Sequence, residues 1–247
     1  MKIDVIGDVH GCYKELDELL HKLGYKDYDG VPIHPEGRKI SFVGDLTDRG
    51  PDSLKVIEKT ARIIDAGKGY YSPGNHCDKL YRYLKGNKVQ IKHGLETTVE
   101  ELEQLNERDR KTLRDTFMKL YEEAPIYQEL DGGKLIVAHA GIQEKDIGRY
   151  TKRIKEFVFY GDVTGEIMEN GLPERRDWAL HYKGTRLIVY GHTPVKSPRS
   201  INKTINIDTG AVFGGKLTAF RYPEEETISV PSSMPFDAAR FREYPGS

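Results

Sequence analysis

The chain has 247 residues, enough for one large domain or two small ones. Its 38 basic and 39 acidic residues leave a formal net charge of -1, which argues against a protein that coats a polyanion. Two cysteines, Cys12 and Cys77, exclude a disulfide scaffold and a zinc site built from several cysteines. Asp4 interrupts the first apolar run, and no later apolar stretch approaches the roughly 20 residues of a membrane-spanning helix, so we expect a cytoplasmic protein with no membrane partner.

The first third of the chain alternates short strands with helices. We expect strands over residues 2–6, 39–43 and 69–72. Apolar residues at helical spacing predict one helix that ends near Leu23 and a second that begins at residues 51–53. The second helix is expected to bury Leu54, Ile57, Ala61 and Ile64. This βαβαβ order favours a parallel sheet with helices on its faces.

The pattern of the remaining chain is first helical and then β. Residues 78–124, approximately, are charged, have helical apolar spacing and predict a helical insertion over the rim of the sheet. Further strands are expected over residues 126–130 and 134–138, which form a hairpin, and over residues 186–190, 204–207, 216–221 and 227–230. We therefore predict a single domain over residues 1–230 and a loosely held C-terminal tail over residues 231–247.

Short polar motifs follow five of the expected strands. They are Gly-Asp-Val-His-Gly (7–11), Gly-Asp-Leu-Thr-Asp-Arg-Gly (44–50), Gly-Asn-His (74–76), His-Ala-Gly (139–141) and Gly-His-Thr (191–193). In an open α/β sheet the carboxyl ends of the strands meet at one edge, where ligands bind. Each motif alone is also typical of an ordinary turn, but five of them together predict a shared site.

The side chains that these motifs supply are metal ligands by type. The candidates are Asp8, His10, Asp45, Asn75, His139 and His192. Asp8 and His10 lie two residues apart and can face one ion, and the two oxygens of Asp45 can bridge two ions. Mixed imidazole and oxygen ligands suit manganese, iron, nickel, cobalt or zinc better than magnesium or calcium. The sequence therefore predicts a site for two divalent transition-metal ions.

Taken in order, these motifs resemble the calcineurin-like metallophosphoesterases of the PPP phosphatase superfamily. Residues 74–80, 159–166, 190–195 and 206–210 are in addition similar to the asymmetrical bis(5′-nucleosyl)-tetraphosphatases of bacilli, and bacterial polynucleotide-phosphatase domains resemble the same segments. The resemblance implies an α/β fold, a four-layer α/β/β/α sandwich. It also implies hydrolysis of a dinucleoside tetraphosphate, such as diadenosine tetraphosphate, to nucleoside monophosphate and triphosphate. The alternative is a broad phosphomonoesterase that acts on phosphoprotein or polynucleotide ends.

The resemblance also implies a role for each motif residue. One metal ion would be held by Asp8, His10 and Asp45, and the other by Asp45, Asn75, His139 and His192. Arg49 would bind the phosphoryl oxygens, and His76, supported by Asp48, would protonate the leaving group. Nickel or manganese is the favoured metal, with iron, cobalt or zinc as alternatives, and binding of a regulatory nucleotide such as GTP is implied without a location. Cys77 departs from the pattern, because many protein phosphatases and the symmetrical tetraphosphatase have Glu there.

Substrate recognition is less well marked in the sequence. Arg175 and Arg176 are candidates for binding the polyphosphate, with ordinary solvated charge as the alternative, and tyrosines of the helical insertion offer a surface for a base. Asp208 either supports a metal-binding histidine or stabilises its own turn. The expected partner is a small dinucleoside polyphosphate, and a stable nucleic-acid partner is not expected.

Overall fold

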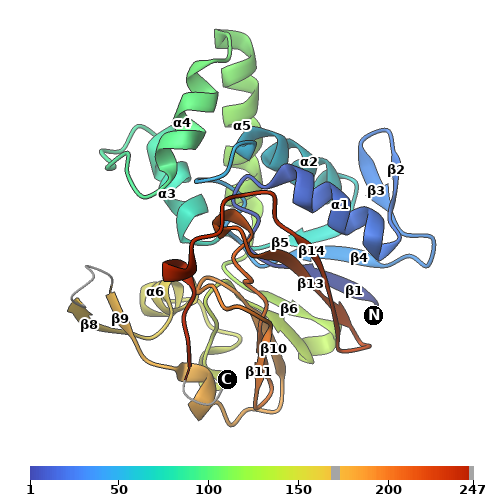
Figure 1. The fold of residues 1–247 in the computed structure, drawn as a ribbon, viewed down its shortest axis with the longest axis vertical. Helices are drawn as coiled ribbons and strands as arrows, with labels where there is room; N and C mark the ends of the chain where they lie inside the picture. The colour runs from blue at the N-terminus through green and yellow to red at the C-terminus, as the bar shows by residue number, and fades with distance from the viewer. Residues whose placement is uncertain (168–172, 245–247) are drawn as a thin grey trace.

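The computed structural model describes residues 1–167 and 173–244. Two five-stranded sheets pack face to face, and helices cover the outer faces of both (Figure 1). The strand orders are β14-β13-β1-β4-β5 in the first sheet and β11-β12-β10-β7-β6 in the second. This arrangement is the expected four-layer α/β/β/α sandwich.

The first sheet is built from both ends of the chain. β1 (Ile3–Ile6), β4 (Lys39–Phe42) and β5 (Gly69–Tyr71) are parallel, while β13 (Lys216–Tyr222) and β14 (Glu226–Pro231) add antiparallel strands on the other side of β1. Helices α1 (Tyr13–Leu23) and α2 (Ser53–Asp65) connect the parallel strands, as the βαβαβ pattern predicts. Ile3 and Val5 face the second sheet, whereas Ile6 packs under the helices.

The second sheet alternates its side chains in the same way. Its strands are β6 (Gln128–Leu130), β7 (Leu135–Val137), β10 (Leu187–Tyr190), β11 (Arg199–Ile201) and β12 (Thr204–Asn206). Leu135 and Val137 point into the layer between the sheets, and Ile136 points outward to helix α6 (Lys152–Tyr160). β7, β10 and β12 are parallel, so their carboxyl ends lie at one edge.

The helical insertion forms three helices, which are α3 (Asn75–Leu84), α4 (Leu95–Glu103) and α5 (Glu107–Glu123). They lie above the first sheet at the top of Figure 1, and α5 packs against α2 and α3. The insertion begins at Asn75 rather than near residue 78, so the first of its helices carries two candidate site residues. In the described ranges, every helix is too short or too polar to span a bilayer.

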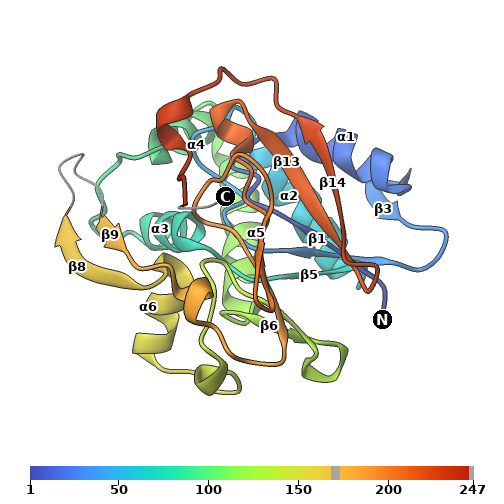
Figure 2. The ribbon, with the colours of Figure 1, turned by 60° about the horizontal axis from the view of Figure 1, so that its bottom comes forward.

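Several elements differ from the sequence expectation. The hairpins β2 (Lys26–Tyr28) with β3 (Val31–Ile33) and β8 (Val163–Ile167) with β9 (Pro173–Arg175), as well as β11 and α6, are not predicted. β2 is exposed throughout and β8 nearly so, so neither shows the apolar alternation of a half-buried strand. In both views β8 and β9 project beside α6 (Figure 2). The buried stripe of α2 includes Val56 and Ile63, while Leu54 and Ile64 are only half-buried.

Residues 231–244, the described part of the segment after β14, contact the rest of the domain at several points. The backbone and hydroxyl of Ser233 donate to the carboxylate of Glu15 at 2.8 and 2.7 Å. Phe241 is buried, and the backbone N–H of Arg242 donates to the carbonyl of Pro194 at 2.8 Å. At Arg242 the segment therefore lies beside the loop that follows β10.

Candidate metal centre

The predicted site residues lie together at the carboxyl ends of the parallel strands. Asp8 follows β1, Asp45 follows β4, Asn75 and His76 start α3 after β5, His139 follows β7 and His192 follows β10. Of the ten non-glycine residues with positive φ in the described ranges, five belong to the predicted site, and these are His10, Asp45, Asp48, Arg49 and His192. Such strain costs roughly 1–3 kcal/mol for each residue and is concentrated at functional sites.

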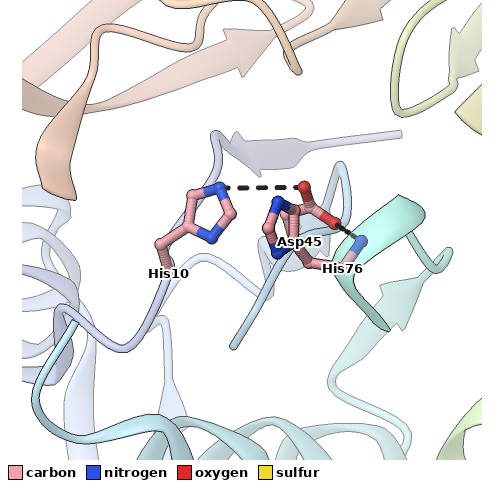
Figure 3. Close-up of side chains that lie close together, drawn as sticks. All are labelled: His10, Asp45 and His76. Carbon is pink, nitrogen blue, oxygen red and sulfur yellow. Dashed lines mark hydrogen bonds and ion pairs between the residues drawn. The ribbon is translucent and has the colours of Figure 1, made fainter. Parts of the chain in front are cut away.

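Asp45 lies at the centre of the site. Its Oδ1 accepts a hydrogen bond from the backbone N–H of His76 at 2.9 Å, and its Oδ2 lies 3.7 Å from His10 Nε2 (Figure 3). The same Oδ2 lies 3.3 Å from His139 Nε2. Two groups of potential ligands thus share this carboxylate, namely His10, Asp45 and His76, and Asp45, His139 and His192. A side chain at position 74 would place its Cβ 2.2 Å from Asp45 Oδ1, so only glycine permits this approach.

The histidine pair on the other side of Asp45 has the spacing of ligands around one ion. His139 Nε2 lies 3.0 Å from Asn75 Oδ1 and 3.0 Å from His192 Nδ1. Metal–ligand bonds of roughly 2.0–2.2 Å place neighbouring ligand atoms about 3.0–3.6 Å apart. Within the described chain, the remaining ring nitrogens, His139 Nδ1 and His192 Nε2, are buried without a hydrogen-bond partner. This donor set fits a divalent transition-metal ion.

Hydrogen bonds fix how two further histidine rings face the site. His10 Nδ1 lies 2.8 Å from the carbonyl of Thr47, which can only accept, so Nδ1 carries the proton and Nε2 presents its lone pair. His76 Nδ1 lies 2.7 Å from Asp48 Oδ2, and the His76 and His10 ring centroids are 4.8 Å apart. The paired Asp48 and His76 have the geometry of an oriented proton donor, although His76 also lies within the first ligand group.

Thr98 is a site residue that the sequence motifs do not reveal. Its hydroxyl donates to Asp48 Oδ1 at 2.8 Å, and the Asp48 N–H donates to Ser53 Oγ at 3.0 Å. Thr98 lies on α4, so the helical insertion helps to hold Asp48 in place. Its only sequence signal is a buried polar position on an otherwise apolar helix face, and that signal is visible only once the helix is placed.

Burial and neighbouring charges shift the pKa of Asp45, His10 and His192 toward the forms that bind metal, whereas they shift the pKa of Asp8 toward its neutral acid. Burial, and then the charges of Asp208 and Asp45, raises the pKa of Asp8. Burial also acts on Asp45, but the charges of His139 and His76 hold its pKa well below the usual range. Burial lowers the pKa of His10 and of His192, so both rings are neutral, which is the form that coordinates a metal.

Three further predicted residues lie beside this centre. Asp8 accepts from the backbone N–H of His192 at 3.1 Å and lies 3.8 Å from His139 Nδ1, outside both ligand groups. Arg49 donates to His10 Nε2 at 2.8 Å, and its guanidinium lies 5.3 Å from the centre of the Phe213 ring. Asp208 accepts from the backbone N–H of Gly210 at 3.0 Å, and burial raises its pKa to about 6.

The residues that the sequence suggests for substrate recognition, two arginines and the tyrosines of the helical insertion, differ in their surroundings. Arg175 and Arg176 line one narrow hollow together with His192. Arg176 forms a 3.2 Å ion pair with Asp162 and is 61% exposed, as expected of an ordinary surface charge. Tyr81 and Tyr121 of the helical insertion stack on each other with ring centroids 4.1 Å apart, so they are occupied within the fold.

The four-layer fold and the carboxylate and imidazole groups at its strand ends are those of a metal-dependent phosphoesterase. A family model described as calcineurin-like phosphoesterase matches residues 1–196. The chain therefore belongs to the calcineurin-like phosphoesterase family.

Two bacterial relatives match the chain over its whole length. The chain is 60% identical over 242 residues to the asymmetrical bis(5′-nucleosyl)-tetraphosphatase PrpE of Bacillus subtilis (strain 168), covering 98% of this chain and 99% of that protein. It is 56% identical over 246 residues to the protein of the same name from Halalkalibacterium halodurans, covering 100% of both.

Solved structures share the fold at lower identity. One, proposed to be a diadenosine tetraphosphatase, has a TM-score of 0.64 at 24% identity and covers 94% of this chain and 93% of that chain. A protein serine/threonine phosphatase from Saccharomyces cerevisiae has a TM-score of 0.56 at 14% identity and covers 96% and 82%. These matches confirm the predicted fold.

Proposed function

We propose that this protein hydrolyses dinucleoside tetraphosphates asymmetrically and releases nucleoside monophosphate and triphosphate. The observation that carries the reaction class is the convergence of imidazole and carboxylate ligands on Asp45, with Arg49 and the His76–Asp48 pair beside it. The substrate is inferred from the names of relatives that are 56–60% identical over at least 98% of the chain. With diadenosine tetraphosphate, the products are AMP and ATP.

We assign the metal ligands as the sequence predicts. One ion would be held by Asp8, His10 and Asp45, and the other by Asp45, Asn75, His139 and His192. When bound, a pair of divalent ions activates water and takes up charge on the phosphoryl oxygens. Nickel or manganese is our first expectation for the metal, with iron, cobalt or zinc as alternatives.

The protein side chains supply the remaining chemistry. The guanidinium of Arg49 offers a planar fork that matches two phosphoryl oxygens, where negative charge grows during the reaction. Asp48 accepts the Nδ1 proton of His76 and so keeps the ring oriented. His76 in its charged form can then donate from Nε2 to the departing oxygen, which for this substrate belongs to the triphosphate product. Asp208 is proposed to support a metal-binding histidine without contacting the metal itself.

Product chromatography tests the proposal. The purified protein is incubated with diadenosine tetraphosphate and each of the five candidate metals in turn. AMP and ATP in equal amounts are expected, whereas two molecules of ADP would mean symmetrical cleavage. No cleavage of the tetraphosphate, together with release of phosphate from a phosphopeptide or a polynucleotide end, would favour the phosphomonoesterase alternative.

Two further expectations accompany this function. We expect the protein to act in the cytoplasm, which fractionation of cells would test. We also expect binding of a regulatory nucleotide such as GTP, and calorimetric titration with a non-hydrolysable GTP analogue would test it.

A further inference from the structure

Two arginine side chains lie side by side next to the metal centre. Arg175 ends β9, and Arg242 belongs to the C-terminal segment, which is drawn in red in Figure 1. A guanidinium N–H of Arg242 donates to the carbonyl of Arg175 at 2.9 Å, and the backbone N–H of Arg242 is held by Pro194. Both arginines line the same hollow as His192, so the C-terminal segment brings a second cation to the edge of the site.

Two positive charges held close together, those of Arg175 and Arg242, are stabilised when an anion binds to them. Burial, and then the charge of Arg242, lowers the pKa of Arg175. In the described part of the chain, no carboxylate lies within 4.0 Å of either guanidinium. Neighbouring arginines differ, because Arg199 forms a 2.6 Å ion pair with Asp177 and Arg176 pairs with Asp162. Among the described residues, Arg175 and Arg242 therefore have no carboxylate partner, and they lie beside His192, a proposed metal ligand.

One contact holds each arginine side chain in place, and each guanidinium keeps further N–H groups that can donate to a ligand. Arg175 Nε donates to the carbonyl of Tyr160 at 2.9 Å, and the Arg242 guanidinium lies 4.7 Å from the centre of the Tyr244 ring. A preorganised guanidinium loses little side-chain entropy when it binds phosphate oxygens. A phosphate group offers several oxygens, so two such guanidinium groups can contact it in the bidentate geometry.

The geometry points to an anion subsite, formed by Arg175 and Arg242, that holds a substrate phosphate next to the one attacked at the metal centre. This assignment rests on the proposed function and extends it, because a polyphosphate can occupy both places at once and a simple phosphomonoester cannot. Arg242 then sets the preference for polyphosphates and has no part in the bond-breaking step.

Arg242→Gln tests the subsite, with Lys196→Gln as the matched control. Lys196 is exposed and paired with Glu243, the residue next to Arg242, so its loss removes the same charge from the same surface. For Arg242→Gln, we expect kcat/KM on diadenosine tetraphosphate to fall by about 10- to 100-fold, mostly through KM, because a contact equal in ground and transition states affects binding alone. The loss on nitrophenyl phosphate is expected to be at most about threefold, and Arg242→Lys is expected to be intermediate.

A second measurement does not depend on the proposed substrate. Inorganic tripolyphosphate and orthophosphate are compared as inhibitors of nitrophenyl phosphate hydrolysis at constant free metal. Arg242→Gln is expected to weaken inhibition by tripolyphosphate about tenfold and by orthophosphate much less. If the wild type does not cleave the tetraphosphate but this difference is found, the proposed function fails and the subsite stands.

Two results would overturn the assignment. One is an equal loss on both substrates in Arg242→Gln, which indicates a structural role for the C-terminal segment. The other is unchanged inhibition by tripolyphosphate in a variant that melts at the wild-type temperature. If Arg242→Gln does not fold, the same comparison is made with Arg242→Lys, for which wild-type inhibition by both anions would contradict a bidentate subsite.

Discussion

His76→Ala separates two roles that the geometry allows for this side chain. The hydrogen bond from His76 Nδ1 to Asp48 is 2.7 Å long and buried, as an oriented general acid requires. His76 also lies close enough to His10 and Asp45 to be a metal ligand. A general acid helps only as much as the leaving group needs a proton, whereas a metal ligand matters equally for every substrate.

The loss of activity expected in each variant depends on the leaving group of the substrate and on the hydrogen bond between His76 and Asp48. General-acid catalysis contributes roughly 10²–10⁴-fold, so His76→Ala is expected to cost that much on a simple alkyl phosphate. The loss of activity is expected to be smallest on nitrophenyl phosphate. On dinucleoside tetraphosphate it is expected to be closer to the loss on nitrophenyl phosphate than to the loss on an alkyl phosphate. Hydrogen bonds to charged groups contribute roughly 1.5–3 kcal/mol, and about 1.4 kcal/mol is tenfold in rate. Asp48→Asn is therefore expected to slow alkyl phosphate hydrolysis by roughly 10- to 150-fold.

The assay compares the three substrates at matched metal content. Asp52→Asn is the control, because it makes the same chemical change in the same loop at a residue that pairs with Lys55 on the surface. A uniform loss on all three substrates, accompanied by loss of bound metal, would assign His76 to the metal centre and refute its role as an acid.

Three other substitutions test the remaining assignments. Asp45→Ala is expected to lower turnover on every substrate by more than about 100-fold, since even partners behind metal ligands cost about 10–100-fold, and full metal occupancy with near-normal turnover would contradict the shared carboxylate. Arg49→Lys is expected to lose roughly 100-fold in kcat/KM with fold and metal content intact, and an unchanged value would make Arg49 structural. Cys77→Ser is expected to stay active, because Cys77 is fully buried and burial raises the pKa of its thiol to about 12; a trapped phosphoryl-cysteine adduct in the wild type would show the opposite.

The sequence allows prediction of those site residues whose positions are set by local rules. Asp8, Asp45, His139 and His192 each follow directly from a buried strand, and parallel strands bring their ends to one edge. Glycine directly precedes Asp8, Asp45 and His192, lies two residues after His139, and lets the chain turn sharply, so each motif carries its own structural signal. The convergence of these residues is therefore predictable without knowing how the helices pack.

Residues that reach the site through tertiary packing carry no such signal. Thr98 lies within a helix of ordinary composition, and only the docking of α4 brings its hydroxyl to Asp48. Arg242 lies in a polar terminal segment, and only the burial of Phe241 and the bond to Pro194 place it beside Arg175. In both cases the deciding contact joins segments far apart in sequence, which periodicity and spacing do not describe.

The two interpretations of Asp208, a support for the metal centre or a turn residue, can be separated through its charge. Burial raises the pKa of Asp208 to about 6, against roughly 3.9 in an unfolded chain. The folded state therefore binds this proton more tightly than the unfolded state. In metal-free protein the charged carboxylate costs stability, and this cost is absent below pH 4, grows between about pH 4 and pH 6 and is complete above pH 6.

Asp208→Asn removes the charge and keeps an oxygen that can accept from the Gly210 N–H. After chelation of metal at pH 8, the variant is expected to be more stable than the wild type by up to about 3 kcal/mol, with a difference that shrinks at pH 4, as thermal melting would show. If Asp208 supports the metal centre, the variant should also bind manganese or nickel about 10- to 100-fold more weakly, which calorimetry measures. A residue that serves only its turn would leave metal affinity unchanged, because asparagine preserves the bond to Gly210. Manganese and nickel affinities within about twofold of wild type would therefore refute the supporting role, whatever the melting temperature, since only the carboxylate charge has been lost.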